Sequence, residues 1–205
     1  MKRIIVAGID TAVGKTIVSS ILTKMFEGSY WKPIQCGTPV DAEWVAQHTN
    51  RLCYPSSFVL KTPCSPHLAA MKEGLQIEIS HLQPPKHHGI LIIEGTGGIL
   101  APLNPTDTWI DAAALWGAHW IVVHRHYLGS LNHFLLTIEA VQQRRIPLLG
   151  VIFNGEGDPF TENMLLKKAR CPCLGRLATE NSFTKWRIQE IATTWTSLWQ
   201  TIPGV

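Results

Sequence analysis

The chain has 205 residues, of which 45% are hydrophobic and 16% charged, with a formal net charge of +3. These proportions are typical of a globular protein and exclude a disordered chain. The basic residues are dispersed in runs no longer than two, such as Lys167–Lys168 and Arg144–Arg145. A clustered basic face is therefore absent from the sequence, and we expect no nucleic-acid partner.

Apolar runs and cysteine spacing limit the compartment in which the chain works. No apolar stretch reaches the ~20 residues of a membrane-spanning helix, so we expect no membrane partner. The run after Lys2 and Arg3 ends at Gly8, too early for a secretory signal. The five cysteines are an odd number, and the pair Cys171 and Cys173 lacks the spacing of a zinc site. We expect free thiols in a reducing cytoplasm.

Short β-branched runs alternate with longer amphipathic stretches along the chain. Strands are expected at 3–8, 30–34, 89–95, 119–124, 147–154 and 173–177, and helices at 15–27, 41–49, 66–73, 108–116, 130–144, 161–169 and 182–199. Several strands are almost entirely apolar, as strands buried on both faces are. The order predicts an α/β fold with a doubly wound, mostly parallel sheet flanked by helices, in a single domain over residues 1–205.

Sheets of this kind bind ligands beyond the carboxyl ends of their strands. We therefore expect the chemistry in the stretches that follow those ends, namely 8–16, 35–41, 94–98, 124–132 and 154–158.

The first of these stretches, Gly8–Thr16, follows an apolar strand and ends in Gly-Lys-Thr. A strand, a glycine-rich turn and a helix in succession favour a phosphate-binding P-loop over a chance Gly-Lys-Thr, because backbone N–H groups and the helix dipole then face the phosphates. Lys15 would reach the β- and γ-phosphates, and the Thr16 hydroxyl would bind Mg²⁺. Five residues separate Gly8 from Gly14, one more than in the ordinary P-loop. The Gly-x-Gly-x-x-Gly pattern of a nicotinamide site is absent.

With its extra residue, the loop GIDTAVGKT resembles the P-loop of the dethiobiotin synthetase family. Four further stretches resemble that family's motifs in the same order: YWKPIQCG (30–37), SPH (65–67), EGTGGILAPL (94–103) and GSLNHFLLT (129–137). The resemblance extends to about Asn154. It implies a P-loop NTPase fold and an ATP-dependent ligase of biotin biosynthesis. Such a ligase joins CO2 to 7,8-diaminopelargonic acid and closes the ring of dethiobiotin, through a carbamate and a carbamic–phosphoric anhydride.

The same resemblance implies roles for particular residues. Lys15, Lys32 and Thr11 would be catalytic, with Lys32 reaching both the carbamate and the γ-phosphate; a surface lysine at a strand end is the alternative. Asn154 would hydrogen-bond adenine. The nucleotide-binding set implied in this way is Gly8, Asp10, Thr11, Ala12, Val13, Gly14, Lys15, Thr16, Glu94, Gly97 and Asn154.

Thr16, Asp41 and Glu94 are the implied ligands of Mg²⁺, which prefers oxygen donors. A carboxylate after an apolar run, as at Glu94, would be unusual without a cation beside it. Asp41 would serve equally as the N-cap of the helix that follows it. Ser65 and His67 match the family's SPH element, although a capping serine and a packed histidine explain them nearly as well.

Lys32 and Cys36 are the implied contacts to the substrate's reacting end, and the helix start Gly129, Ser130, Leu131 and Asn132 is implied to hold its tail carboxylate. In the family that helix start belongs to the other subunit of a homodimer. Three positions depart from the family pattern. Tyr127 replaces a basic residue, for which Arg125 and His126 would compensate; Cys36 replaces a serine, and Ala12 a residue that can be acidic.

Other P-loop proteins are the main alternatives. Regulatory ATPases of the partitioning and division-site class carry an additional lysine near the start of the loop, where this chain has Gly8, Ile9 and Asp10. A GTPase would need Asn-Lys-x-Asp, which 154–158 does not provide. An amidoligase acting on cobyrinic acid would carry a glutaminase domain, for which this chain is too short. A non-catalytic nucleotide-binding module would leave Lys32 and Glu94 without a purpose.

Overall fold

The computed structural model describes residues 2–202, and its main element is a seven-stranded sheet of order β4-β2-β6-β1-β7-β8-β9. Every neighbouring pair in it is parallel. The strands are β1 (Arg3–Gly8), β2 (Ser29–Trp31), β4 (Cys53–Tyr54), β6 (Leu91–Glu94), β7 (His119–Arg125), β8 (Leu148–Asn154) and β9 (Cys173–Leu177). A separate parallel pair joins β3 (Ile34–Cys36) to β5 (Phe58–Leu60). The doubly wound, parallel α/β fold is confirmed.

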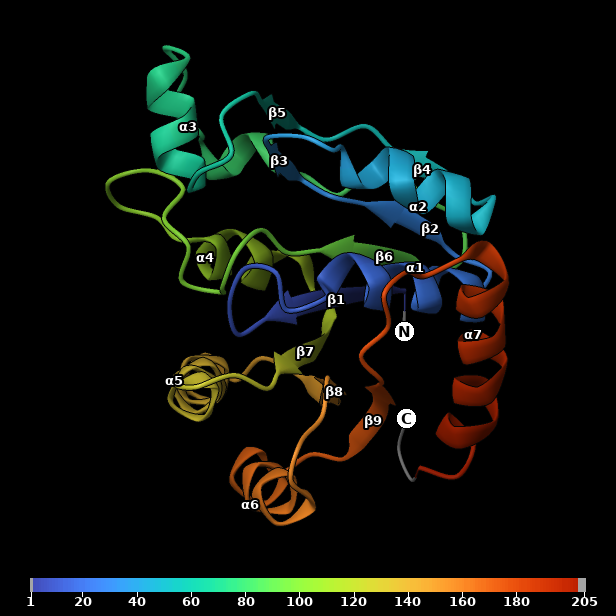
Figure 1. Ribbon diagram of the computed structural model, residues 1–205. Coiled ribbons are helices and arrows are strands. Elements are labelled where there is room, and N and C mark those ends of the chain that lie inside the picture. The colour runs from blue at the N-terminus through green and yellow to red at the C-terminus, as the bar shows by residue number, and fades with distance from the viewer. Residues whose placement is uncertain (1, 203–205) are drawn as a thin grey trace.

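Helices cover both faces of the sheet (Figure 1). On one face lie α1 (Lys15–Met25), α2 (Asp41–Thr49) and α7 (Lys185–Trp199), which contact one another. On the other lie α5 (Ser130–Gln143) and α6 (Pro159–Ala169), together with the short α4 (Trp109–Ala113). The remaining helices are α3 (Pro66–Lys72), beside β3 and β5, and the 3₁₀ turns η1 (Ile79–His81) and η2 (Ala114–Trp116).

The central strands are buried on both faces, as their apolar runs predict. Residues 4–6 of β1 and 91–93 of β6 are wholly inaccessible to solvent. Burial of apolar surface on both faces is the main stabilising contribution of such a sheet. The core therefore fixes the carboxyl ends of β1 and β6, and with them the residues that follow those strands.

The expected strand 30–34 is wrong as a single element. β2 ends at Trp31 and β3 begins at Ile34 in the separate two-stranded sheet. Pro33 lies between them, and a proline cannot donate to a sheet ladder. The break leaves Lys32 directly after β2 and outside the hydrogen-bonded ladder of the sheet. Its side chain faces the ends of the central strands.

Several helix boundaries differ from the expected ones for local reasons. The helix expected at 161–169 begins at Pro159, because Asp158 caps it by accepting a 2.7 Å hydrogen bond from the Thr161 N–H. The helix expected at 182–199 begins at Lys185, with Thr184 as its cap. The stretch 108–116 divides into α4 and η2. Within residues 2–202, no helix combines the length and the apolar character needed to cross a membrane.

His124, near the end of β7, is a buried histidine without charge. Its ring packs against Phe134 and Phe153 at centroid distances of 5.4 and 5.5 Å, and its buried Nδ1 atom has no hydrogen-bond partner among residues 2–202. Burial, and then the proximity of His126, lowers the pKa of His124 to about 4. The unfolded chain would protonate this ring near pH 6.5, so protons favour the unfolded state between those two values.

We therefore expect His124→Phe to make the protein less sensitive to acid. The wild type should lose on the order of 2 kcal/mol more unfolding free energy than the variant between about pH 7 and about pH 4.5, because only the wild type carries this histidine. Urea unfolding of both proteins at the two pH values measures the difference. Equal losses would show that His124 does not contribute.

Candidate active site

The carboxyl ends of the central strands open into a cavity of about 910 Å³. This is the edge at which parallel sheets bind ligands. The cavity brings together ten of the residues singled out from the sequence: Thr11, Ala12, Gly14, Lys15, Thr16, Lys32, Cys36, Asp41, Glu94 and Gly97. Ser65 also lines it, whereas the exposed His67 does not.

Close approaches explain two glycines of the P-loop. Gly14 has φ +98°, and a Cβ there would lie 2.5 Å from the Asn154 side-chain nitrogen. A Cβ at Gly8 would lie 2.9 Å from Lys15 Nζ and 2.8 Å from Val13 Cγ2. Larger residues at these two positions would displace the groups that shape the loop.

The start of α1 is arranged to accept an anion. Its N-cap, Gly14, offers no side chain to the first N–H groups, and the first turn contains no acidic residue. Those N–H groups and the positive end of the helix dipole are therefore available to phosphate. Lys15 is only 6% exposed and donates a 2.7 Å hydrogen bond to the Asp10 carbonyl. Burial lowers the pKa of Lys15 to about 8.

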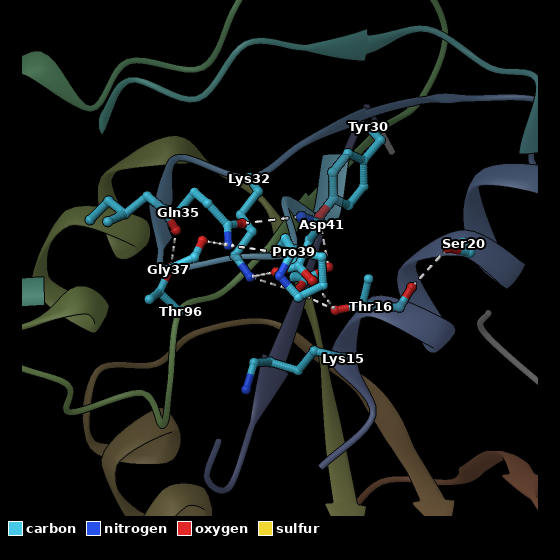
Figure 2. Close-up of polar contacts among 12 residues, drawn as sticks. Lys15, Thr16, Ser20, Tyr30, Lys32, Gln35, Gly37, Pro39, Asp41 and Thr96 are labelled. Carbon is cyan, nitrogen blue, oxygen red and sulfur yellow. Dashed lines mark hydrogen bonds and ion pairs between the residues drawn. The ribbon is translucent and has the colours of Figure 1, made fainter. Parts of the chain in front are cut away.

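Lys32 lies between two carboxylates. Its ammonium bonds to Asp41 and, at 3.1 Å, to Glu94 Oε1. The Thr16 hydroxyl lies 2.9 Å from Glu94 Oε1 and 3.3 Å from Asp41 Oδ1, and Figure 2 shows Lys32, Asp41 and Thr16 converging. Burial acts to lower the pKa of Lys32, but the charges of Glu94 and Asp41 outweigh it and raise the pKa above its usual range. Lys32 therefore stays protonated. Because its exposed fraction is only 8%, the expected alternative of a surface lysine is wrong.

Tyr30 completes the surroundings of Glu94. Its hydroxyl donates a 2.7 Å hydrogen bond to Glu94 Oε2, and both side chains are buried. Burial, and then the charge of Glu94, raises the pKa of Tyr30 well above its usual range. The phenol consequently stays protonated and remains a donor.

Gln35 positions the segment before α2. Its amide nitrogen donates to the carbonyls of Gly37 and Pro39 at 3.0 and 3.2 Å, and its oxygen accepts from the Asp41 N–H at 3.3 Å. The N-cap of α2 is Val40, so the expectation that Asp41 caps this helix is wrong. Asp41 is instead the first helical residue, and its carboxylate is directed at Lys32.

Two further groups of residues singled out from the sequence lie outside the cavity. Gly8, Asp10, Val13 and Asn154 support the P-loop; Asn154 Nδ2, for example, donates to the Val13 carbonyl at 2.9 Å. Gly129, Ser130, Leu131 and Asn132 form the start of α5, whose N-cap Gly129 offers no side chain to its N–H groups.

The environment of Tyr127 differs from the expected one. Its hydroxyl lies 3.1 Å from Asp10 Oδ2 and 2.7 Å from His133 Nδ1. Arg125 donates to the Ala12 carbonyl at 3.1 Å, and His126 pairs with Glu162. Arg125 and His126 are thus engaged elsewhere, and His133 is the basic side chain that accompanies Tyr127.

Sequence reasoning missed Tyr30 and Gln35. The spacing of Tyr30 and Lys32 is a signal that was present, because residues two apart on a strand share a face. Nothing in the sequence marks Gln35, whose partners all come from the turn that follows it.

Comparison with known proteins identifies a matching family and several similar relatives. A family profile described as an AAA domain, AAA_26, matches residues 2–186. A relative from Chlamydia pneumoniae, named ATP-dependent dethiobiotin synthetase BioD, is 41% identical over 211 residues, covering 100% of this chain and 96% of its own. A relative of the same name from Rhodopseudomonas palustris strain HaA2 is 41% identical, covering 86% of this chain and 85% of its own.

Solved structures show the same fold at low sequence identity. A putative plasmid partition protein from Borrelia burgdorferi bound to AMPPNP has a TM-score of 0.57 at 12% identity, covering 97% of this chain and 99% of its own. The cell division ATPase MinD from Pyrococcus furiosus has a TM-score of 0.55 at 12% identity, covering 97% and 100%. These likenesses establish a P-loop ATPase fold and carry no information on the reaction.

Proposed function

Because the chain belongs to the dethiobiotin synthetase family, we propose that its cavity joins CO2 to 7,8-diaminopelargonic acid and closes the ring of dethiobiotin at the expense of ATP. The chain is accordingly an ATP-dependent ligase of biotin biosynthesis. The observation that carries this proposal is the convergence of Lys15, Lys32, Thr16 and Glu94 in one cavity behind an uncapped helix start. We also propose that it works in the cytoplasm, where ATP is supplied.

The reaction has three steps. One substrate amine forms a C–N bond with CO2 and loses a proton, giving a carbamate. A carbamate oxygen then attacks the γ-phosphorus of ATP, and ADP leaves. Finally, the second amine attacks the carbonyl carbon of the mixed anhydride and loses a proton, phosphate leaves, and the cyclic urea is closed.

The second step brings two anions together, so the protein must supply positive charge at the transferring group. The N–H groups of the P-loop and Lys15 would hold the β- and γ-phosphates. Lys32 would neutralise the carbamate oxygen as it approaches phosphorus. Thr11 and Gly97 both line the cavity and lie side by side, since a Cβ at Gly97 would be 3.7 Å from Thr11 Oγ1. They would contact the diamine, and Asn154 would hydrogen-bond adenine.

The oxygen donors in the cavity fit Mg²⁺. Asp41 and Glu94 already bind a cation, the Lys32 ammonium, and the Thr16 hydroxyl lies within hydrogen-bond distance of both carboxylates. Mg²⁺ prefers oxygen ligands and usually keeps several waters, with substrate phosphate oxygens as further ligands. Thr16, Asp41 and Glu94 would hold Mg²⁺, and the bound ion would neutralise phosphate charge.

The start of α5 would bind the tail carboxylate of a substrate held by a partner subunit. Gly129–Asn132 do not line the cavity of their own chain. The Ser130 N–H donates to the Tyr127 carbonyl at 3.0 Å, but no side chain caps the helix start, whose other N–H groups suit an anion. Leu128, Leu131 and Leu136 are exposed around this helix, at 104%, 38% and 53%. Exposed apolar groups of this kind favour an interface, and so support a homodimer in which each subunit completes the other's site.

ADP release with Mg-ATP and bicarbonate, with and without 7,8-diaminopelargonic acid, tests the function. We expect release only with the diamine, and a product of dethiobiotin mass by mass spectrometry. Hydrolysis indifferent to the diamine would contradict the proposal and favour a regulatory ATPase of the partitioning or division-site class. That alternative is supported by the shared fold alone.

We expect Cys36→Ser to leave kcat within a few-fold of the wild type. Cys36 lines the cavity, and burial, with a smaller effect of Cys64, raises the pKa of its thiol to about 11, so it is a neutral group at physiological pH. A hydroxyl is a better hydrogen-bond donor than a thiol and has nearly the same shape. Steady-state kinetics of the variant measures the effect; a large loss of kcat would show that the thiol itself is required.

A further inference from the structure

Tyr30 lies on the same face of the sheet as the proposed metal site. β2 pairs in parallel with β6, with Tyr30 opposite Ile92 and Trp31 opposite Ile93. Side chains alternate between the faces of a sheet, so Tyr30 shares a face with Lys32 and with Glu94 at the end of β6. Trp31 points the other way, and its ring packs against Trp116 at a centroid distance of 5.5 Å.

The two oxygens of Glu94 have different partners. Oε1 accepts from Thr16 at 2.9 Å and from Lys32 at 3.1 Å, on the side that faces the cavity. Oε2 accepts from the Tyr30 hydroxyl at 2.7 Å, on the buried side. Tyr30 is wholly inaccessible to solvent and Glu94 is 1% exposed, so water cannot take over this hydrogen bond.

We propose that Tyr30 is a positioning residue for magnesium binding, because its hydroxyl anchors Oε2 of Glu94 and keeps Oε1 directed at Thr16 and Lys32. The inference rests on the proposed function, in which Thr16, Asp41 and Glu94 hold Mg²⁺. Carboxylate ligands of metal ions are commonly oriented by a hydrogen bond from a residue that does not touch the metal, and loss of such a partner costs about 10- to 100-fold in metal affinity or activity.

Tyr30→Phe removes the hydroxyl and keeps the ring. Binding of ADP to the purified protein is measured by isothermal titration calorimetry over a series of Mg²⁺ concentrations and in EDTA. We expect the Mg²⁺ concentration for half-maximal enhancement of ADP binding to rise about 10-fold or more, while the affinity in EDTA stays within about two-fold. An unchanged Mg²⁺ dependence, or equal weakening with and without Mg²⁺, would overturn the proposal.

Tyr54→Phe is the matched control. It is the same chemical change, but the Tyr54 hydroxyl donates to the Lys86 carbonyl at 3.0 Å in an exposed position away from the cavity. Its Mg²⁺ dependence should equal that of the wild type. A shift equal to that of Tyr30→Phe would mean that the effect is not specific to Glu94 and would count against the proposal.

A measurement on the unmodified enzyme guards against misfolding of the variant. The chain has three tyrosines, so their ring carbons are readily assigned by NMR after labelling at Cζ. Mg²⁺ added to the ADP-bound protein should shift the Tyr30 signal and leave that of Tyr54 in place; an unmoved Tyr30 signal refutes the coupling. Diamine-dependent turnover by the wild type is assayed separately, so failure of this inference is distinguishable from failure of the function.

Discussion

Lys32→Met is expected to lower kcat by about 10³-fold or more, because it removes one positive charge from the transferring phosphoryl group. Methionine keeps most of the length and volume of the side chain, so the cavity should retain its shape. Diamine-dependent ADP release under saturating substrates measures the loss. Retention of near-wild-type kcat would exclude Lys32 from the reaction.

The same variant should be less stable without metal. Glu94 is almost inaccessible and would lose its ammonium partner, and removal of one member of a buried ion pair costs on the order of 3 kcal/mol. Mg²⁺ with ADP should restore part of this loss by binding the same oxygens of the folded state. Thermal unfolding with and without Mg-ADP therefore distinguishes a variant that has lost only a charge from a variant that no longer folds.

Lys15→Ala is expected to reduce kcat/KM for ATP by about 10³-fold. Lys15 is the lysine of the P-loop, and its buried ammonium would contact the transferring phosphate. ADP affinity should fall as well, because Lys15 would contact the β-phosphate in the product complex. Steady-state kinetics and calorimetry measure the two effects.

Lys24→Ala provides the matched control for Lys15→Ala. Both lysines belong to α1, but Lys24 lies in its last turn and does not line the cavity. Its kinetic constants should be those of the wild type. Full activity of Lys15→Ala beside an intact Lys24→Ala would exclude the proposed contact of Lys15 with the phosphates.

Much of the fold follows from local sequence. The apolar runs of β1 and β6 predict buried parallel strands, and α2 has the bounds expected from its pattern. The pair β3 and β5 could not be predicted, because each strand has three residues and depends on a partner distant in the chain. Short strands give too few alternations to be distinguished from loops.

The candidate site, like the fold, could be predicted from the sequence only in part. Motifs point to Lys15 at the start of a helix and to Lys32 and Glu94 at the ends of strands, because phosphate chemistry needs these residue types at such positions. Motifs do not identify Tyr30, whose hydrogen bond to Glu94 spans 64 positions of the chain.

The Lys32 ammonium, between Asp41 and Glu94, acts as an internal counter-ion for these two carboxylates. Proteins whose structural metal supplies the folding energy cannot mature until the ion arrives. Here an ammonium of the chain itself balances part of the negative charge of Asp41 and Glu94, so we expect the chain to fold without magnesium. If the proposed magnesium site is correct, we therefore expect a shortage of the ion to lower the activity of the enzyme while leaving its fold in place.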